Sequence, residues 1–418
     1  MLITKSDFVI YLFALLALVT SSCLKSKKPG IPPEVLKALD NSGIYKPRLL
    51  KVILAFQKPE DSLKLQSAYY LIKNLQHNYS RTISLIDSND NDVKIKINNF
   101  SDYLSIKKHI DSIESTSGVI FTKTDSIILD INNVSSEFLI NHINTTFSTK
   151  ENTPWGSKYD YTTFYNYILP YRIANEKLES YSTHFQKKYE YLINQSEDVD
   201  KVALDLSNSI NNEILYDNRL EINLNCQNFD TIEKTLTGNL CDINTYKIFA
   251  LRSIGIAAAL DYTPYFSDSV LGYYSTTVIL PNKSEIRLTN SDNNTLPYAQ
   301  GKTAKVYRRT YNNDPKSLFS TKNKKTHTPP FLGNFNYIDV TNSYIETANV
   351  TITSPDTAEY VYLAVYNEST WKPIDWAVPE PSGKASFYNM GTDIIYMPVI
   401  VSGDSIISVG EQFLLEKK

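Results

Sequence analysis

The sequence predicts a multidomain α+β protein with a helical N-terminal domain, a core in which one helix leads into consecutive strands, and a C-terminal β-sandwich. The chain has 418 residues, which suggests two or three domains at about 150 residues each. Apolar residues recur with helical spacing up to residue 229, whereas short alternating segments dominate after residue 337. We therefore expect a signal peptide at 1–22, a tether at 23–34, the helical domain at 35–229, the core with a connector at 230–330 and the β-sandwich at 331–418.

An apolar run from Phe8 to Val19 follows Lys5 near the N-terminus. It is too short to cross a bilayer, so it indicates a secretory signal rather than a membrane helix. Small residues precede Cys23 and resemble a bacterial lipobox, in which the cysteine is lipidated and the preceding peptide is removed. We expect Cys23 to anchor the protein in the bacterial cell envelope through acyl chains. An ordinary signal peptide with a coincidental cysteine is the alternative, and the basic residues after Cys23 leave the membrane face open.

Several apolar stripes of helical period lie between residues 31 and 229. In Ser62–Tyr79 the apolar residues lie close to i, i+3, i+4, i+7 spacing. The turn-rich run Asp87–Asp92 interrupts this pattern, and we expect a short strand at Val93–Ile97 after it. The other expected helices are Ser135–Phe147, Tyr161–Ile173, Ser182–Ile193 and Val199–Leu215.

The pattern changes at residue 240. We expect one helix at Cys241–Ile254, because Gly255 follows it as the usual C-terminal glycine. The polar stretch Ser291–Phe331 is expected to form a connector or lid. The expected strands are Ile256–Tyr262, Tyr273–Leu280 and Glu285–Leu288 in the core, then Tyr360–Tyr366, Lys384–Tyr388, Ile394–Val401 and Ser405–Val409.

Two motifs lie at the ends of the expected helix: Thr237–Asp242 (TGNLCD) and Leu251–Ala257 (LRSIGIA). Together they resemble the transglutaminase-like superfamily, papain-type thiol enzymes with a Gly-x-x-Cys start, a helix and a Leu-Arg-x-x-Gly-Ile-Pro-Ala segment. Tyr167–Arg172, Lys305–Thr310 and Trp371–Trp376 resemble a lipoprotein branch of this superfamily that is common in Bacteroidetes. The resemblance covers most of the mature chain and implies a papain-like α+β core.

Cys241 is the nucleophile that the resemblance implies. A cysteine at a helix N-terminus faces the positive end of the helix dipole, which favours the thiolate and lowers the pKa of the thiol. In a catalytic protein, Cys241 would attack an acyl carbon and form a thioester, and nearby backbone N–H groups would stabilise the oxyanion.

The remaining triad positions depart from the family pattern. The family places its general-base His in a Gly-His-x-Trp strand and an Asp on the next strand. Here Tyr274 occupies the His position, Thr276 the Trp position, and Thr289 or Asn290 the Asp position. A phenol with a reference pKa of about 10 is a poor base at neutral pH. Among the histidines, only His327 lies on a segment that could cover the site of Cys241.

Cys241 also has a structural interpretation. Lipidation of Cys23 would leave Cys226 and Cys241 as an even pair of thiols in an oxidising compartment. They are separated by 15 residues, and closing such a loop with a disulfide stabilises a protein by roughly 3 kcal/mol. From the sequence, a disulfide or an inert buried cysteine and a reactive thiol are about equally favoured.

Composition and motifs exclude several function classes. The formal net charge of −3 argues against a nucleic-acid partner. The chain has no HExxH, no CxxC and no Gly-rich phosphate loop after a strand, so no metal and no cofactor are expected.

The leading hypothesis is a degenerate transglutaminase-like lipoprotein that binds a peptide, glycopeptide or glycan with little or no catalysis. In it, Tyr262, Tyr273 and Tyr274 would line the cleft and stack against the ligand. The alternative is an active transglutaminase or cysteine-peptidase-like enzyme that uses Cys241 for acyl transfer or amide hydrolysis.

Overall fold

The computed structural model describes residues 30–116, 121–223, 225–267, 271–289, 302–322, 326–329, 331–334, 336–355, 358–403 and 405–417. The expected signal peptide, Cys23, the first part of the tether and Asn290 lie outside the described residues. Within the described ranges, no helix is both long enough and apolar enough to cross a membrane.

Helices dominate the part of the chain before residue 254, and α12 is the central one. In chain order the helices are α2 (Pro33–Asn41), α3 (Lys46–Ala55), α4 (Ser62–Asn74), α5 (Tyr103–Thr116), α6 (Asp130–Asn133), α7 (Ser136–Asn152), α8 (Tyr161–Tyr167), α9 (Ser182–Ile193), α10 (Val199–Glu213), α11 (Phe229–Thr235), α12 (Leu240–Ser253) and α13 (Leu318–Thr321). Helix α9 has the expected bounds, but α8 stops at Tyr167 instead of Ile173. Pro170, which cannot donate a backbone hydrogen bond, lies in the irregular segment that follows.

A five-stranded antiparallel sheet packs against α12. Its order is β7 (Glu285–Leu288), β6 (Tyr273–Ile279), β5 (Ala258–Thr263), β8 (Tyr307–Arg309) and β9 (Tyr337–Asp339). Helix α12 contacts β5 and β6, and Leu251, Ile254 and Ile256 are fully buried. The combination of helices and strands confirms the α+β class. Strands β8 and β9 were not expected, and β9 lies beyond residue 330, where the core was expected to end.

Helix α12 begins and ends at specific local signals. The Asn239 side chain accepts a hydrogen bond from the Asp242 N–H (2.9 Å), and the Asp242 carboxylate accepts one from the Asn239 N–H (3.0 Å), which makes a capping box. At the other end, Gly255 has a φ of +80°. The Gly255 N–H donates to the carbonyl of Arg252, and the Ile256 N–H donates to that of Leu251. This pair of bonds is a Schellman motif, so Gly255 ends the helix as predicted.

Arg252, near the end of α12, connects the helix to two other parts of the fold. Its buried guanidinium donates to the carbonyl of Ala258 from Nε (3.1 Å) and from Nη2 (2.8 Å). Its Nη1 donates to the carbonyls of Pro170 (2.9 Å) and Arg172 (3.2 Å). The guanidinium therefore holds the start of β5 and the segment after α8 against the same helix.

The expectation of a strand at Val93–Ile97 is wrong. The strands of this region are β1 (Tyr79–Ile86) and β2 (Phe121–Leu129), which form a separate antiparallel pair. Val93 donates one backbone hydrogen bond to Leu85 without extending the ladder, and a 3₁₀ turn begins at Ile97. Because β1 starts at Tyr79, α4 ends at Asn74 instead of reaching Tyr79.

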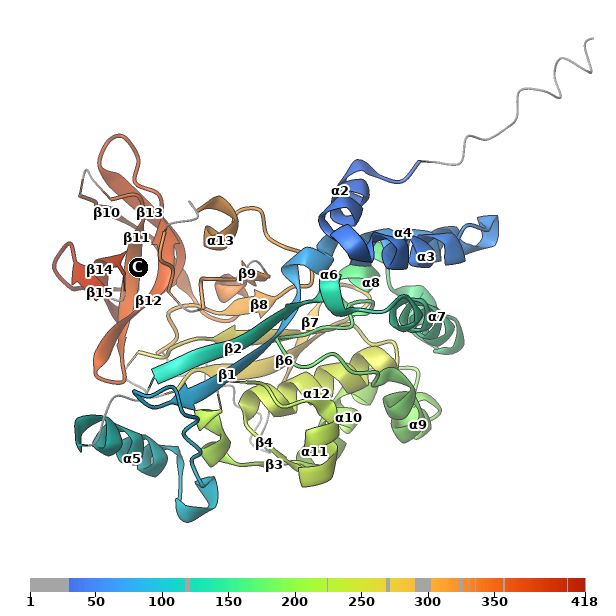
Figure 1. The fold of residues 1–418 in the computed structure, drawn as a ribbon, viewed down its shortest axis with the longest axis horizontal. Helices are drawn as coiled ribbons and strands as arrows, with labels where there is room; N and C mark the ends of the chain where they lie inside the picture. Colours follow the sequence, from blue (N-terminus) through green and yellow to red (C-terminus); the bar gives the residue numbers. More distant parts are fainter. Residues whose placement is uncertain are drawn as a thin grey trace, which may run out of the picture.

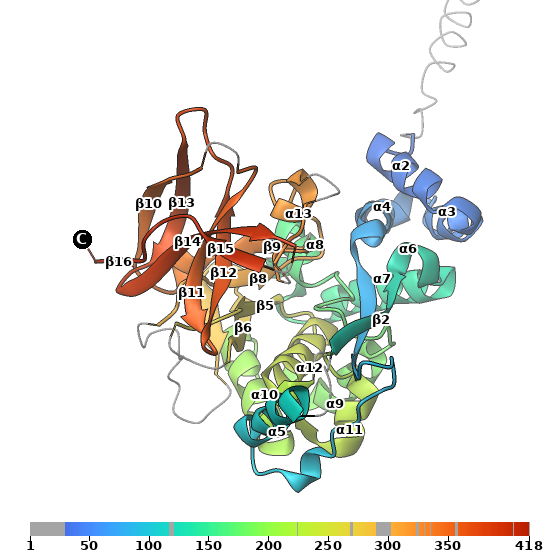
Figure 2. The same cartoon turned by 60° about the vertical axis from the view of Figure 1, so that its left-hand side comes forward.

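The C-terminal region consists of strands. They are β10 (Thr347–Thr353), β11 (Val361–Asn367), β12 (Thr370–Ala377), β13 (Lys384–Gly391), β14 (Ile394–Ser402), β15 (Ser405–Ser408) and β16 (Phe413–Leu415). One sheet has the order β12-β11-β14-β15 with β16 also paired to β14, and β10 pairs with β13 in a second sheet. Strands β11, β13, β14 and β15 lie close to the expected positions. Figures 1 and 2 show these strands and helices α2–α4 on opposite sides of the molecule.

A buried lysine joins these strands to the core. Lys305, just before β8, is 1% exposed, and its ammonium contacts Asp339 on β9 (2.7 Å) and Asp375 on β12 (2.9 Å). It also donates to the carbonyl of Tyr388 on β13 (2.6 Å). One cation therefore fixes three strands at this junction.

We predict that Arg252→Met destabilises the protein strongly. The substitution leaves three buried carbonyl oxygens without their donor, and each buried unsatisfied acceptor costs about 1–3 kcal/mol. We expect the free energy of unfolding to fall by about 3 kcal/mol or more, measured by urea denaturation followed by circular dichroism. Lys234→Met removes an exposed cation that pairs with Asp230, and should change stability by less than about 0.5 kcal/mol. Equal losses in the two variants would contradict the role of Arg252.

Candidate functional site

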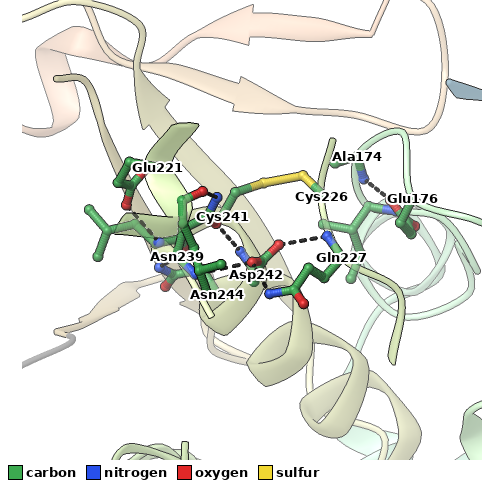
Figure 3. The surroundings of a disulfide bond; sticks show 12 residues. Ala174, Glu176, Glu221, Cys226, Gln227, Asn239, Cys241, Asp242 and Asn244 are labelled. Atoms are coloured by element: carbon green, nitrogen blue, oxygen red, sulfur yellow. Dashed lines mark hydrogen bonds between the residues drawn. A yellow bond between two sulfur atoms is a disulfide. The ribbon is translucent and has the colours of Figure 1, made fainter. Parts of the chain in front are cut away.

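Cys241 is disulfide-bonded to Cys226 in this structure (Figure 3). Cys241 is the second residue of α12 and is 7% exposed, whereas Cys226 lies half-buried on the segment before α11. The two Cα atoms are 6.2 Å apart. Of the two alternatives that the sequence left open, the structure therefore contains the disulfide, and the sulfur of Cys241 is not a free thiol.

Two carboxylates occupy the start of α12. Glu221 accepts a hydrogen bond from the N–H of Leu240 (3.1 Å). Asp242 is fully buried and accepts from the backbone and side-chain N–H groups of Gln227 (both 2.7 Å) as well as from its own cap residue. Burial raises the pKa of both the Glu221 and the Asp242 carboxyls. Sequence reasoning missed these two acidic groups as neighbours of Cys241, although Asp242 stands in the quoted motif.

The two carboxylates change the electrostatics expected for Cys241. The positive end of a helix favours a thiolate because its first N–H groups lack partners. Here the N–H groups of Leu240 and Asn239 already bond to carboxylates. These two N–H groups are therefore not free to stabilise an anion at the start of α12.

Tyr274, at the position of the family His, lies near the start of β6. It is half-buried, and its ring stacks on that of Tyr262 with centroids 5.9 Å apart. Burial raises the pKa of Tyr274 above its ordinary value of 10; Arg309 opposes this effect, and the carboxylates of Glu221 and Asp242 add to it. The phenolate form, which a base would require, is therefore even less accessible than in a free tyrosine.

The expectation that three tyrosines line the cleft and stack against a ligand is wrong for two of them. Tyr262 is 5% exposed and Tyr273 is 9% exposed. Tyr262 packs in an apolar cluster with Tyr307, and Tyr273 packs in another with Phe266. These rings fill the protein interior, so neither presents a face to a ligand.

The positions of the family Trp and Asp have structural roles. Thr276 is buried and donates from its hydroxyl to Oδ1 of Asn244 (2.9 Å). The carbonyl of Thr289 accepts from Lys247 (3.1 Å) and from Asn211 (3.3 Å). His327 is exposed, and the hydroxyl of the adjacent Thr326 donates to Glu359 (2.9 Å), just before β11. None of these contacts brings a proton acceptor to Cys241.

A groove of about 320 Å³ borders the disulfide on the Cys226 side. None of its lining side chains is charged. The lining residues are Ile83, Leu85, Val93, Ile95, Ile97, Ile222, Asn223, Asn225, Cys226 and Gln227. Across the part of the chain that the structure describes, no group of three or more His, Cys, Asp or Glu residues is arranged to hold a metal ion.

Comparisons with known proteins reveal little similarity. No protein-family model matches the chain, and no curated protein matches it. A proposed cysteine protease from Cytophaga hutchinsonii is 18% identical over 27% of this chain and 38% of its own, with a TM-score of 0.22. A proposed protease from Parabacteroides distasonis is 11% identical over 57% of this chain and 51% of its own, with a TM-score of 0.26. Because this chain spans only these shares of the two proteins and the TM-scores are this low, neither similarity assigns an activity to it.

We predict that Lys247 makes stability depend on pH. Burial lowers the pKa of the Lys247 ammonium from 10.5 to about 7. Between pH 7 and 10.5 the unfolded chain therefore holds a proton at this position that the folded chain has lost, so the free energy of unfolding rises with pH. The expected slope is up to about 1.4 kcal/mol per pH unit, and below about pH 7 this contribution is constant.

Urea denaturation of the wild type and of Lys247→Met between pH 6 and 10 measures this effect. The difference in stability between the two proteins should change across that range, whereas Lys234→Met should follow the wild type. Parallel curves for the wild type and Lys247→Met would show that Lys247 stays protonated in the folded state.

Proposed function

We propose that this chain is a cell-envelope lipoprotein whose transglutaminase-like core binds a peptide, glycopeptide or glycan with little or no catalysis. In this proposal the strands after residue 331 form a β-sandwich domain attached to the core. The motifs Thr237–Asp242 and Leu251–Ala257 support the core assignment. The packing of α12 on the antiparallel strands β5 and β6 fits the helix-then-strand order of that superfamily.

The observation that carries the proposal is the Cys226–Cys241 disulfide. Acyl transfer by a thiol enzyme begins with a thiolate that attacks a carbonyl carbon. The sulfur of Cys241 in the disulfide is not a thiolate, and it carries no proton that a base could remove. The oxidised protein therefore lacks the nucleophile.

Proton transfer gives independent support. The leaving amine must receive a proton, and general acid–base help contributes about 10²–10⁴-fold to such reactions. Tyr274 stands where the family His would provide it, with a pKa raised by burial. A group that stays protonated near neutral pH cannot take the thiol proton, so reduction of the disulfide would not by itself produce an enzyme.

The lipid anchor is a separate part of the proposal. It rests on the short apolar run Phe8–Val19 and the small residues before Cys23. Acyl chains on Cys23 would tether the folded part through residues 24–34 to one membrane of the envelope.

We predict no Cys241-dependent turnover in the wild type. Hydrolysis of a peptide panel and amine incorporation into it would be measured for the wild type, Cys241→Ala, Tyr274→His and His327→Ala, each with and without dithiothreitol. Binding of the same panel would be followed by calorimetry. We expect binding without turnover in the wild type, and at most a trace of turnover in reduced Tyr274→His, because only that variant places an imidazole at the base position.

A wild-type rate that both Cys241→Ala and His327→Ala abolish would overturn the proposal. That result would identify an active thiol enzyme whose base comes from the connector. Failure of every peptide and glycopeptide to bind would contradict the binding function.

We predict lipid attachment at Cys23. Metabolic labelling of a bacterial expression host with a fatty-acid analogue should mark the wild type and not Cys23→Ala, because the lipid is carried by that sulfur. Cys226→Ala should be labelled like the wild type, because it keeps Cys23 and the small residues before it. Equal labelling of the wild type and Cys23→Ala would argue against a lipoprotein.

A further inference from the structure

The segment Asn225–Gln227 connects α12 to strand β1. The side chain of Asn225 accepts from the N–H of Ile83 and donates to the carbonyl of Ile83, both at 2.8 Å. Two residues later, Gln227 donates to Asp242 from its backbone and its side chain. Cys226 stands between them and is bonded to Cys241. The disulfide therefore holds in place a segment whose side chains cap the edge of β1.

The two sulfurs differ in their access to solvent. Cys226 is half-buried and lines the groove of about 320 Å³ beside the disulfide. Cys241 is 7% exposed and does not line that groove. A thiol that enters the groove consequently meets Cys226 first, and no charged side chain among the lining residues repels a thiolate.

We propose that the Cys226–Cys241 disulfide is a redox-operated latch that fixes Asn225–Gln227 against β1 and α12 and releases that segment when a dithiol reduces it. The latch goes beyond the proposed function, because it requires neither a bound peptide nor turnover.

The chemistry is thiol–disulfide exchange with a dithiol as the reductant. One thiolate of the dithiol attacks the sulfur of Cys226, the Cys226–Cys241 bond breaks, and Cys241 leaves as a thiolate that takes a proton from water. The second thiol of the reductant loses its proton and attacks the mixed disulfide. The reductant becomes a disulfide, Cys226 leaves as a thiolate that takes up a proton, and two electrons have passed to the cysteine pair.

Release should be local, because the neighbouring elements have their own supports. Helix α12 retains its capping box, its Schellman motif and the contacts of Arg252. Strand β1 remains paired with β2 along its other edge. By contrast, Asn225 and Gln227 would be held only through side-chain and turn contacts once the covalent bond is broken.

Hydrogen exchange on the full chain tests the latch. The wild type would be compared with and without dithiothreitol by mass spectrometry with fragmentation to single residues. We expect exchange at the amides of Ile83 and Gln227 to become about tenfold faster after reduction, while α12 and β11 keep their protection. Alkylation with iodoacetamide would confirm in the same samples that both cysteines are reduced.

Two variants separate the covalent bond from the hydrogen bonds. Cys226→Ser should show the exchange pattern of the reduced wild type and should not respond to dithiothreitol. Asn225→Ala keeps the disulfide but removes both bonds to Ile83, so it should speed exchange at Ile83 in the oxidised protein and leave Gln227 protected.

Three outcomes would overturn the latch. Unchanged exchange at Ile83 and Gln227 after complete reduction would show that the segment is held without the disulfide. Faster exchange throughout the chain would make the disulfide a global staple. A disulfide that dithiothreitol reduces only in denaturant would show that Cys226 is not accessible to a thiol.

Discussion

The buried guanidinium of Arg252 is the contact on which the arrangement of the layers depends. Burial lowers the pKa of Arg252, an effect that Tyr181 and Glu176 oppose, and four hydrogen bonds to carbonyl oxygens compensate the buried charge. Those oxygens belong to the start of β5 and to the segment Pro170–Arg172. Arg172 in turn bonds through its own guanidinium to the fully buried Asp130, at 2.7 Å from Nε. Arg252 bonds the backbone of Arg172, and Arg172 bonds Asp130 in α6. The two arginines therefore join α12, its sheet and the N-terminal helices.

Three segments, Tyr167–Arg172, Lys305–Thr310 and Trp371–Trp376, make buried contacts between layers. Tyr167–Arg172 supplies the carbonyls for Arg252. Lys305–Thr310 supplies Lys305, which pairs with two aspartates, and Arg308, whose guanidinium bonds Asp261 on β5 at 2.8 Å. Trp371–Trp376 supplies Asp375 to Lys305. These three segments therefore supply buried polar and ionic contacts between layers of the fold.

The sequence predicts an element well when the residues that determine it are only a few positions apart in the chain. Helix α12 and its end at Gly255 follow from a cap and a glycine that are local in the chain. Strands β1 and β2 were missed because Tyr79 pairs with Leu129, and neither strand alternates clearly between polar and apolar residues. The disulfide was left as one of two alternatives, because no pattern shows that Cys226 lies beside the start of α12. For the same reason, the sequence did not predict that Glu221 lies at the start of α12, because Glu221 precedes Cys241 by 20 residues.

The start of α12 combines several features that bear on the proposed lack of thiol chemistry. A helix N-terminus assists such chemistry when its N–H groups are free to stabilise a developing anion. In this chain the Leu240 N–H bonds to Glu221 and the Asn239 N–H to Asp242, so these donors are already occupied by carboxylate oxygens. An imidazole at position 274 would supply a base but would leave these N–H groups bonded to the carboxylates. In this structure the sulfur of Cys241 is in a disulfide, burial raises the pKa of Tyr274, and the N–H groups of Asn239 and Leu240 are bonded to carboxylates. A substitution at Tyr274 would change only one of these three features.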